Sequence, residues 1–334
     1  MNRMVLMLAA LLAWPTITRA AADAGPAQSA TGGNAQVTAT LFSHVAVCQA
    51  GQPFEAAVLF SIKPDWHIYW ENPGDGGIAT RVEFSVPAGY TVSTPRFSVP
   101  STFVMPGDIH NFGYEESALV SVIVTPPAGA SEGPEVGAAV DWLACDPKEC
   151  VPGKAQLDLS VPIGAASKDP AASAIFDKWA DRMPREFSEL PAAPTGLAQA
   201  SSKPIAGGNE IEQVEMHNAA VGMPPWDGKF TFTVSWKNAP NVVEWYPNPG
   251  ENVLVKDVTL TTRGHTTIID FTVDANAHAD PKLIPFASVL AYDEDDGRHG
   301  VIVHVAPVKA ARRGGAATNV IESPSSAASE SNPK

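Results

Sequence analysis

The chain has 334 residues, 45% of them hydrophobic and 8% aromatic, which is enough apolar material for folded domains and suits two domains better than one. Its formal net charge of −14 gives it no electrostatic reason to bind nucleic acid or an anionic membrane surface. With 30 prolines, 26 glycines and few long helical patterns, the composition favours short strands and turns, and so an all-β protein.

The first residues have the pattern of an export signal. Arg3 precedes an apolar run that ends at Trp14, and alanines at 20–22 offer a cleavage site. The run has about eleven residues, too few for the roughly 20 that span a bilayer. We therefore expect residues 1–22 to be a cleaved signal peptide and residues 23–35 a flexible leader. The mature protein would reach an oxidising compartment, where disulfides persist, without direct membrane insertion.

Strand-like alternation of apolar and polar residues begins at Gln36 and recurs in three further segments. Proline and glycine turn signals separate these segments. Short strands at this spacing predict a β-sandwich, which we assign to residues 36–165. Trp66 and Trp70 would share one face of a strand in it, and we expect both to lie in the core.

Two cysteines, Cys145 and Cys150, lie close together near the end of this domain, and the third cysteine is Cys48. A loop of about six residues constrains the unfolded chain by roughly 2 kcal/mol, so the pair would be a poor structural staple. A redox couple needs two sulfurs close enough to bond and one face open to a partner. Three carboxylates within residues 141–149 face a single lysine, Lys148, which favours a carrier that a partner's thiolate reduces over a strongly acidic oxidant.

Other interpretations of these residues remain open. The pair could be a passive surface disulfide, or two ligands of a metal site, although structural zinc usually takes four ligands. Cys48 lies in an apolar strand and is expected to be a small buried hydrophobe. The eight histidines occur without ligand spacing, but Met216 with His217, and Met105 with His110, are residue pairs that bind copper in proteins. We expect no metal or other cofactor.

The clearest helical pattern follows in a connecting segment, residues 166–190. Asp169 can serve as the N-cap, Pro170 stands at the first helical position and Pro184 ends the pattern. Apolar residues recur between these points at helical spacing, namely Ile175, Phe176, Trp179 and Met183. We expect this face to pack against one or both sandwiches.

The chain contains an internal repeat. Residues 54–75 align without a gap on residues 230–251 and share a phenylalanine, a valine, a proline and an Asn-Pro-Gly turn. A second match pairs residues 143–153 with residues 290–300. Two matches in the same order indicate duplicated domains.

Residues 191–310 would then form a second sandwich. Its first part, as far as residue 210, has the composition of a linker. Tyr292 and Gly297 stand where the first copy has its closely spaced cysteines, so only the first copy can perform thiol chemistry. Residues 311–334 have the composition of a disordered tail.

Three motifs in order resemble a known family. They are Trp66-His-Ile-Tyr-Trp-Glu-Asn-Pro-Gly-Asp75, Asn111-Phe-Gly-Tyr-Glu115, and Trp142-Leu-Ala-Cys-x4-Cys-Val-Pro-Gly153. Together they resemble the periplasmic N-terminal domain of the thiol:disulfide interchange protein DsbD, and more closely the longer version in the suppressor-of-copper-sensitivity relatives called ScsB. The spacing of the cysteines has one residue fewer than in the best-known member.

This resemblance implies an immunoglobulin-like fold in which Cys145 and Cys150 are the redox couple. In the family the pair takes electrons from a membrane-embedded electron transporter of the DsbD, ScsB or CcdA kind and passes them to periplasmic oxidoreductases of the thioredoxin fold. The resemblance places two further residues beside the active site, His67 and Tyr69. It also implies a cap loop that shields the sulfurs, formed by Asp108, His110, Phe112 and Tyr114.

We therefore predict two immunoglobulin-like β-sandwiches, joined by a short helix and linker, in a periplasmic protein-disulfide reductase. The alternative is a non-enzymatic copper-binding or assembly module whose β-domains serve as a docking surface. Replacing both cysteines by serine separates the two, because a binding module would keep its affinity.

Overall fold

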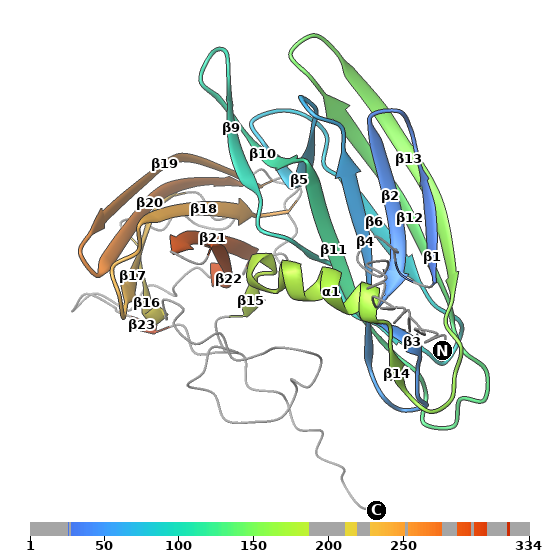
Figure 1. Cartoon of the computed structure of the whole chain (residues 1–334). Coiled ribbons are helices and arrows are strands. Elements are labelled where there is room, and N and C mark those ends of the chain that lie inside the picture. The colour runs from blue at the N-terminus through green and yellow to red at the C-terminus, as the bar shows by residue number, and fades with distance from the viewer. Residues whose placement is uncertain are drawn as a thin grey trace, which may run out of the picture.

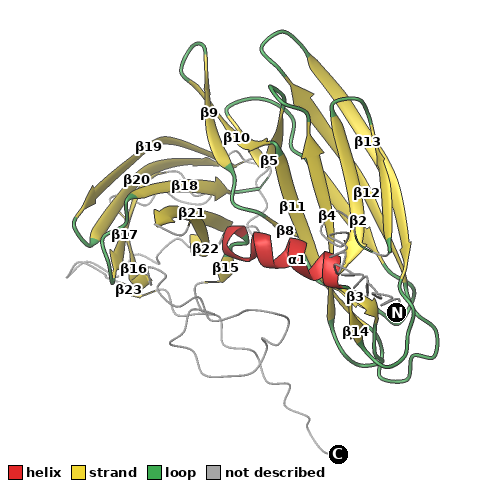
Figure 2. Cartoon of the chain, viewed as in Figure 1, coloured by secondary structure: helices red, strands yellow, loops and turns green. Residues whose placement is uncertain are grey.

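The computed structural model describes residues 26, 28–186, 211–218, 228–250, 253–275, 286–294, 297–305 and 319–320. Within these ranges the chain is built almost wholly of strands, as the colours of Figure 2 show, and the predicted all-β fold is confirmed. The predicted signal peptide, the linker and most of the predicted tail lie outside the described residues. Figure 1 shows two β-sandwiches side by side, with one helix near their junction.

The first sandwich consists of two sheets of six strands and a short third sheet. One sheet contains β1 (Ser29–Gly33), β2 (Val37–Ser43), β4 (Phe54–Ile62), β11 (Ser117–Thr125), β7 (Thr91–Val92) and β8 (Arg96–Phe97). The facing sheet contains β13 (Cys150–Ser160), β12 (Glu135–Cys145), β5 (His67–Gly74), β10 (Ile109–Glu115), β9 (Ser101–Met105) and β6 (Arg81–Ser85). The short sheet pairs β3 (Val45–Val47) with β14 (Ser167–Lys168).

The core of this sandwich lies between the facing sheets, where alternate side chains of each strand meet. Phe60 of β4 and Trp142 of β12 pack edge to face, with ring centroids 5.8 Å apart. Fully burying a large apolar side chain contributes about 1.5–3 kcal/mol. Trp66 and Trp70 are 7% and 1% exposed in the same core, which confirms the prediction for both tryptophans.

Two segments that were expected to be irregular contain strands. Residues 29–33, assigned to a flexible leader, form β1, which pairs with β2 and packs so closely on β13 that a Cβ at Gly32 would lie 2.9 Å from the Cβ of Ala155. Residues 319–320, assigned to a disordered tail, form β23. In both segments pairing with the edge of a sheet outweighs a small or polar composition.

The helix α1 (Pro170–Trp179) begins as the sequence predicts. The Asp169 carboxylate accepts the N–H groups of Ala171 and Ala172 at 2.9 and 3.1 Å. The helix ends at Trp179, earlier than the pattern suggested, and a 3₁₀ turn (Ala180–Arg182) leads to Pro184, which cannot continue a helix.

One face of α1 covers the outer surface of the first sandwich. Phe176 contacts Phe42 of β2, with ring centroids 5.3 Å apart. The other members of this outer cluster are Ala57, Leu119, Ala172, Trp179 and Met183. Strands β4 and β11 are therefore buried on both faces, by the core within and by the helix outside.

The second sandwich repeats the first in its strand pairing. One sheet contains β19 (Val253–Arg263), β20 (Thr266–Ala275), β17 (Gly228–Trp236), β16 (Ile211–Asn218) and β23 (Asn319–Val320). The other contains β15 (Arg185–Glu186), β22 (Gly297–Val305), β21 (Phe286–Glu294) and β18 (Val242–Asn248). The central strands β17, β18, β21 and β22 pair as their counterparts β4, β5, β12 and β13 do. This agreement extends the internal repeat from sequence to topology.

Candidate redox site

The cysteine pair closes a β-hairpin. Strand β12 ends at Cys145, β13 begins at Cys150, and the two residues are direct partners across the strands, joined by a disulfide. The intervening turn is organised by Asp146, whose Oδ1 accepts the N–H groups of Lys148 and Glu149 at 2.7 and 2.8 Å. These two hydrogen bonds lower the pKa of the Asp146 carboxyl. The turn therefore holds the two cysteines opposite each other.

The two cysteines differ in exposure. Cys145 is 2% exposed, whereas Cys150 is an exposed residue at the start of its strand. The hydroxyl of Tyr69 donates a hydrogen bond to the Sγ atom of Cys145 at 3.4 Å. Burial raises the pKa of Tyr69, so the phenol keeps its proton and stays a donor. An incoming thiolate can thus reach Cys150, while Cys145 is supported from within the fold.

His67 is the cross-strand partner of Cys145 on β5. Its ring lies edge-on to Tyr69, with centroids 5.3 Å apart, and its Nε2 atom has no hydrogen-bond partner among the described residues. Burial lowers the pKa of His67 more than the nearby Glu115 raises it, so the imidazole is neutral near neutral pH. The structure therefore brings both predicted neighbours, His67 and Tyr69, to the cysteine pair.

A hairpin formed by β9 and β10, here called the cap hairpin (residues 101–115), lies against this group. Phe103 of β9 stacks on His67 with ring centroids 5.1 Å apart and an interplanar angle of 26°. Phe103 was not among the residues predicted from the sequence. One signal in the sequence could have indicated it. Phe103 is an aromatic residue on the strand that pairs with the predicted cap segment, where it is the direct partner of Asn111.

The four predicted cap residues have other surroundings. Asp108 and His110 lie at the hairpin tip, where the Asp108 carboxylate is 3.2 Å from Nε2 of His110. Phe112, expected over the sulfurs, packs edge-on against Tyr246 of the second sandwich, with centroids 5.0 Å apart. Tyr114 lies in the core and donates its hydroxyl to the carbonyl oxygen of Ser98 at 2.6 Å.

The cause of this difference is the register of the cap hairpin. β10 pairs with β9 in an unbroken register in which Phe112 is opposite Thr102 and Asn111 is opposite Phe103. Direct cross-strand partners share a face and successive residues alternate, so Phe112 and Phe103 lie on opposite faces of the hairpin. The ring of Phe112 is directed to the second sandwich, and the ring that contacts His67 comes from the neighbouring strand.

Cys48 is free, 1% exposed, and held by backbone hydrogen bonds to Pro162 and Gly164 at 2.8 Å each. The prediction of a small buried hydrophobe is confirmed. No group of three or more potential metal ligands occurs among the described residues. Of the two suggested pairs of copper ligands, Met216 and His217 lie in β16, whose side chains fall outside the description, and Met105 and His110 lie in the strands β9 and β10.

In the second sandwich, Tyr292 occupies the position of Cys145 and is buried, stacking on His299 with ring centroids 5.5 Å apart. Gly297 occupies the position of Cys150 at the start of β22. The equivalent hairpin thus ends in an aromatic contact in place of a disulfide.

The described part of the chain holds no helix with the length and apolar character needed to cross a membrane.

A family model described as the N-terminal domain of thiol:disulfide interchange protein DsbD matches residues 36–162. None of the curated proteins compared with the chain matches it. Among solved structures, the N-terminal periplasmic domain of ScsB from Proteus mirabilis is similar with a TM-score of 0.52 and 16% identity, covering 82% of this chain and 94% of that one. The structural likeness concerns the fold, and residues 36–162 are the part of the chain that is similar to the DsbD N-terminal domain family.

Proposed function

We propose that this protein is a thiol:disulfide exchange protein in which Cys145 and Cys150 take two electrons from one partner and pass them to another. The observation that carries the proposal is the asymmetry of the pair: Cys150 is exposed, and Cys145 is buried beneath the Tyr69 hydroxyl. A passive surface disulfide does not require one accessible sulfur and one supported sulfur. Exchange does, because one sulfur is attacked while the other leaves.

In the reducing half-reaction, a thiolate of the partner attacks Sγ of Cys150. The Cys145–Cys150 bond breaks, a mixed disulfide forms, and Cys145 leaves as a thiolate that accepts the hydrogen bond from Tyr69. The partner's second thiolate then attacks its own sulfur in the mixed disulfide and releases Cys150. The partner dithiol becomes a disulfide and the pair becomes a dithiol. The reverse sequence reduces a client disulfide.

The surroundings of the pair fit these steps. A hydrogen bond to a charged group contributes about 1.5–3 kcal/mol, so the phenol of Tyr69 favours departure of Cys145. The neutral ring of His67 lies between Tyr69 and Phe103 and limits access of water to the buried sulfur. Phe103 takes the shielding role that the sequence suggested for Phe112. Displacement of the Phe103 ring by a docking partner would widen the approach to the pair.

The family match supports the kinds of partner and the compartment. We propose a membrane-embedded electron transporter of the DsbD, ScsB or CcdA kind as donor and thioredoxin-fold oxidoreductases as clients, in the periplasm. Exchange between sulfurs needs no bound cofactor.

The test uses the full mature chain with Cys48→Ser as background. We expect the pair to titrate reversibly between dithiol and disulfide in glutathione buffers, followed by alkylation and mass measurement. Of the single-cysteine variants, Cys145→Ser, which leaves exposed Cys150, should form a mixed disulfide with an aromatic disulfide reagent much faster than Cys150→Ser. Equal rates for both variants, or a pair that does not re-form its disulfide, would reject the proposal.

A further inference from the structure

The cap hairpin lies between the cysteine site and the second sandwich. Successive residues of β9 point to opposite faces, as in any strand. Phe103 stacks on His67, whereas the hydroxyl of Thr102 donates to the Tyr246 hydroxyl at 3.4 Å. On β10, Phe112 contacts the same tyrosine. One face of the hairpin thus meets the redox site and the other meets the second sandwich.

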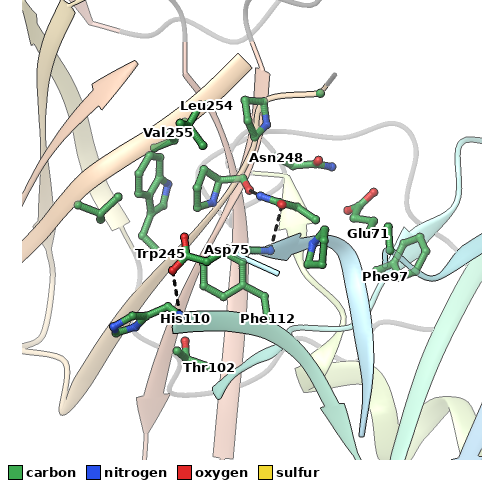
Figure 3. A pocket seen from close by; sticks show the side chains of 18 of the residues that line it. Glu71, Asp75, Phe97, Thr102, His110, Phe112, Trp245, Asn248, Leu254 and Val255 are labelled. Carbon is green, nitrogen blue, oxygen red and sulfur yellow. Dashed lines mark hydrogen bonds between the residues drawn. The ribbon is translucent and has the colours of Figure 1, made fainter. Parts of the chain in front are cut away.

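Tyr246 belongs to β18 of the second sandwich but packs as part of the core of the first. It is fully buried, it belongs to the first sandwich's core cluster, and its ring is 6.0 Å from that of Trp70. Burial raises the pKa of Tyr246, so its hydroxyl keeps its proton. Figure 3 shows the pocket beside this contact, where Thr102 and Phe112 of the hairpin line the same space as Trp245.

Arg298 of β22 fixes this contact from the other side. Its Nη2 atom donates to the Tyr246 hydroxyl at 2.8 Å and to the carbonyl oxygen of Pro100, directly before β9, at 3.3 Å. Asp293 at 3.0 Å and Glu244 hold the guanidinium in place. An arginine with two carboxylate partners is a fixed anchor, since its planar fork leaves little freedom once it is paired.

Val99, the residue before Pro100, is also fixed by contacts with other elements. The Val99 N–H donates to the carbonyl oxygen of Arg182 at 2.8 Å. Gly300 of β22 approaches Val99 so closely that a Cβ there would lie 2.3 Å from its Cγ2 atom. The start of the cap hairpin is therefore held by the 3₁₀ turn after α1, by β22 and by Arg298.

We propose that the second sandwich is a brace for the cap, with Tyr246 and Arg298 as positioning residues that keep Phe103 on His67. This inference rests on the proposed redox function of the cysteine pair, and it gives the second sandwich a defined task. Neither residue touches a sulfur. They act through the hairpin, because its Thr102 face cannot leave Tyr246 without moving the Phe103 face from His67. A partner that separates the hairpin from β18 would thereby widen access to the disulfide from the buried Cys145 side.

The experiment measures the rate at which a small dithiol, dithiothreitol, reduces the Cys145–Cys150 disulfide in the full mature chain. Arg298→Met keeps the apolar stem and removes the hydrogen bonds to Tyr246 and Pro100, so we expect reduction about ten-fold faster. Thr102→Val removes one hydrogen bond, and Tyr246→Phe removes the acceptor of both Thr102 and Arg298. Each should accelerate reduction less than Arg298→Met, because Arg298 keeps its hydrogen bond to Pro100. Arg263→Met, at the exposed end of β19 in the same sandwich, is the matched control and should leave the rate unchanged.

Repeating the measurement in a Phe103→Ala background distinguishes an effect through the Phe103 ring from a general destabilisation of the fold. In Phe103→Ala the shielding ring is gone, so reduction should be fast and Arg298→Met should add nothing to it. If the two effects multiply, or if Arg298→Met, Tyr246→Phe and Thr102→Val all leave the rate of the wild-type background unchanged, the brace is rejected.

Two further readouts keep the result decisive. Thermal midpoints identify any variant that fails to fold, and Thr102→Val alters only the hairpin side of the contact, so it tests the brace even if Arg298→Met is unstable. The wild-type glutathione titration tests the proposed function separately. A wild-type pair that does not cycle rejects the redox function, whereas a cycling pair with unaltered variant rates rejects only the brace.

Discussion

Glu71 of β5 lies two residues beyond Tyr69 and borders the pocket between the two sandwiches, as Figure 3 shows. Burial raises the pKa of its carboxyl from 4.5 to about 7, although a hydrogen bond with Asn248 of the second sandwich lowers it. The perturbation that isolates this group is Glu71→Gln, which keeps the shape and removes the titration.

The gap between the folded and unfolded pKa values of Glu71 sets the magnitude. It is about 2.5 pKa units, which corresponds to about 3 kcal/mol at 1.36 kcal/mol per unit. Between pH 4.5 and about 7 the folded state keeps a proton that the unfolded state has released. The free energy of unfolding should therefore fall as the pH rises through this window and level off above it. The protein should lose most of this about 3 kcal/mol between pH 5 and pH 8.

Urea unfolding at a series of pH values measures this dependence. We expect Glu71→Gln to flatten the curve between pH 5 and pH 8, while Glu83→Gln, an exposed carboxylate on the neighbouring strand β6, keeps the wild-type slope. If Glu71→Gln and the wild type have the same slope, Glu71 is not the group that titrates, and the argument from its burial is wrong.

Three other predictions concern the site and its support. Tyr69→Phe removes the donor to Cys145 and so destabilises the reduced form, which should make the reduction potential more negative by about 30–65 mV in a glutathione titration; an unchanged potential would remove Tyr69 from the mechanism. Asp169→Ala removes the cap of α1 and should cost about 1 kcal/mol in urea unfolding, and a neutral effect would contradict the capping role. Gly153→Ala would place a Cβ 2.3 Å from the indole of Trp142 and should destabilise the fold by about 1–3 kcal/mol, and an unaltered thermal midpoint would show that the indole can move aside.

The features that the sequence predicted well are local ones. The N-cap at Asp169 and the core positions of Trp66 and Trp70 follow from short-range spacing, which tertiary packing did not override. The closeness of Cys145 and Cys150 follows from a tight turn between paired strands. These interactions are complete within a few residues of chain.

The cap could not be assigned in the same way. Which ring faces His67 depends on the register of β9 against β10, and a slip of one residue in a register moves a side chain to the opposite face. Phe103 and Phe112 are both aromatic residues of one hairpin, and Tyr246 lies on the face that carries Phe112. That tyrosine is more than a hundred residues distant in sequence, beyond the reach of any local pattern.

The burial of Cys48 has a consequence for the fidelity of exchange. A chain with three sulfurs can form three different intramolecular disulfides, and two of them would disable the pair. Burial raises the pKa of the Cys48 thiol, so little thiolate is present to attack Cys145 or Cys150. The backbone of Cys48 is held by hydrogen bonds to Pro162 and Gly164, and its side chain lies in the core. We therefore expect Cys48 to exchange with the Cys145–Cys150 disulfide only slowly. The fold thus favours the Cys145–Cys150 disulfide, because it buries Cys48, the thiol that could compete for either cysteine.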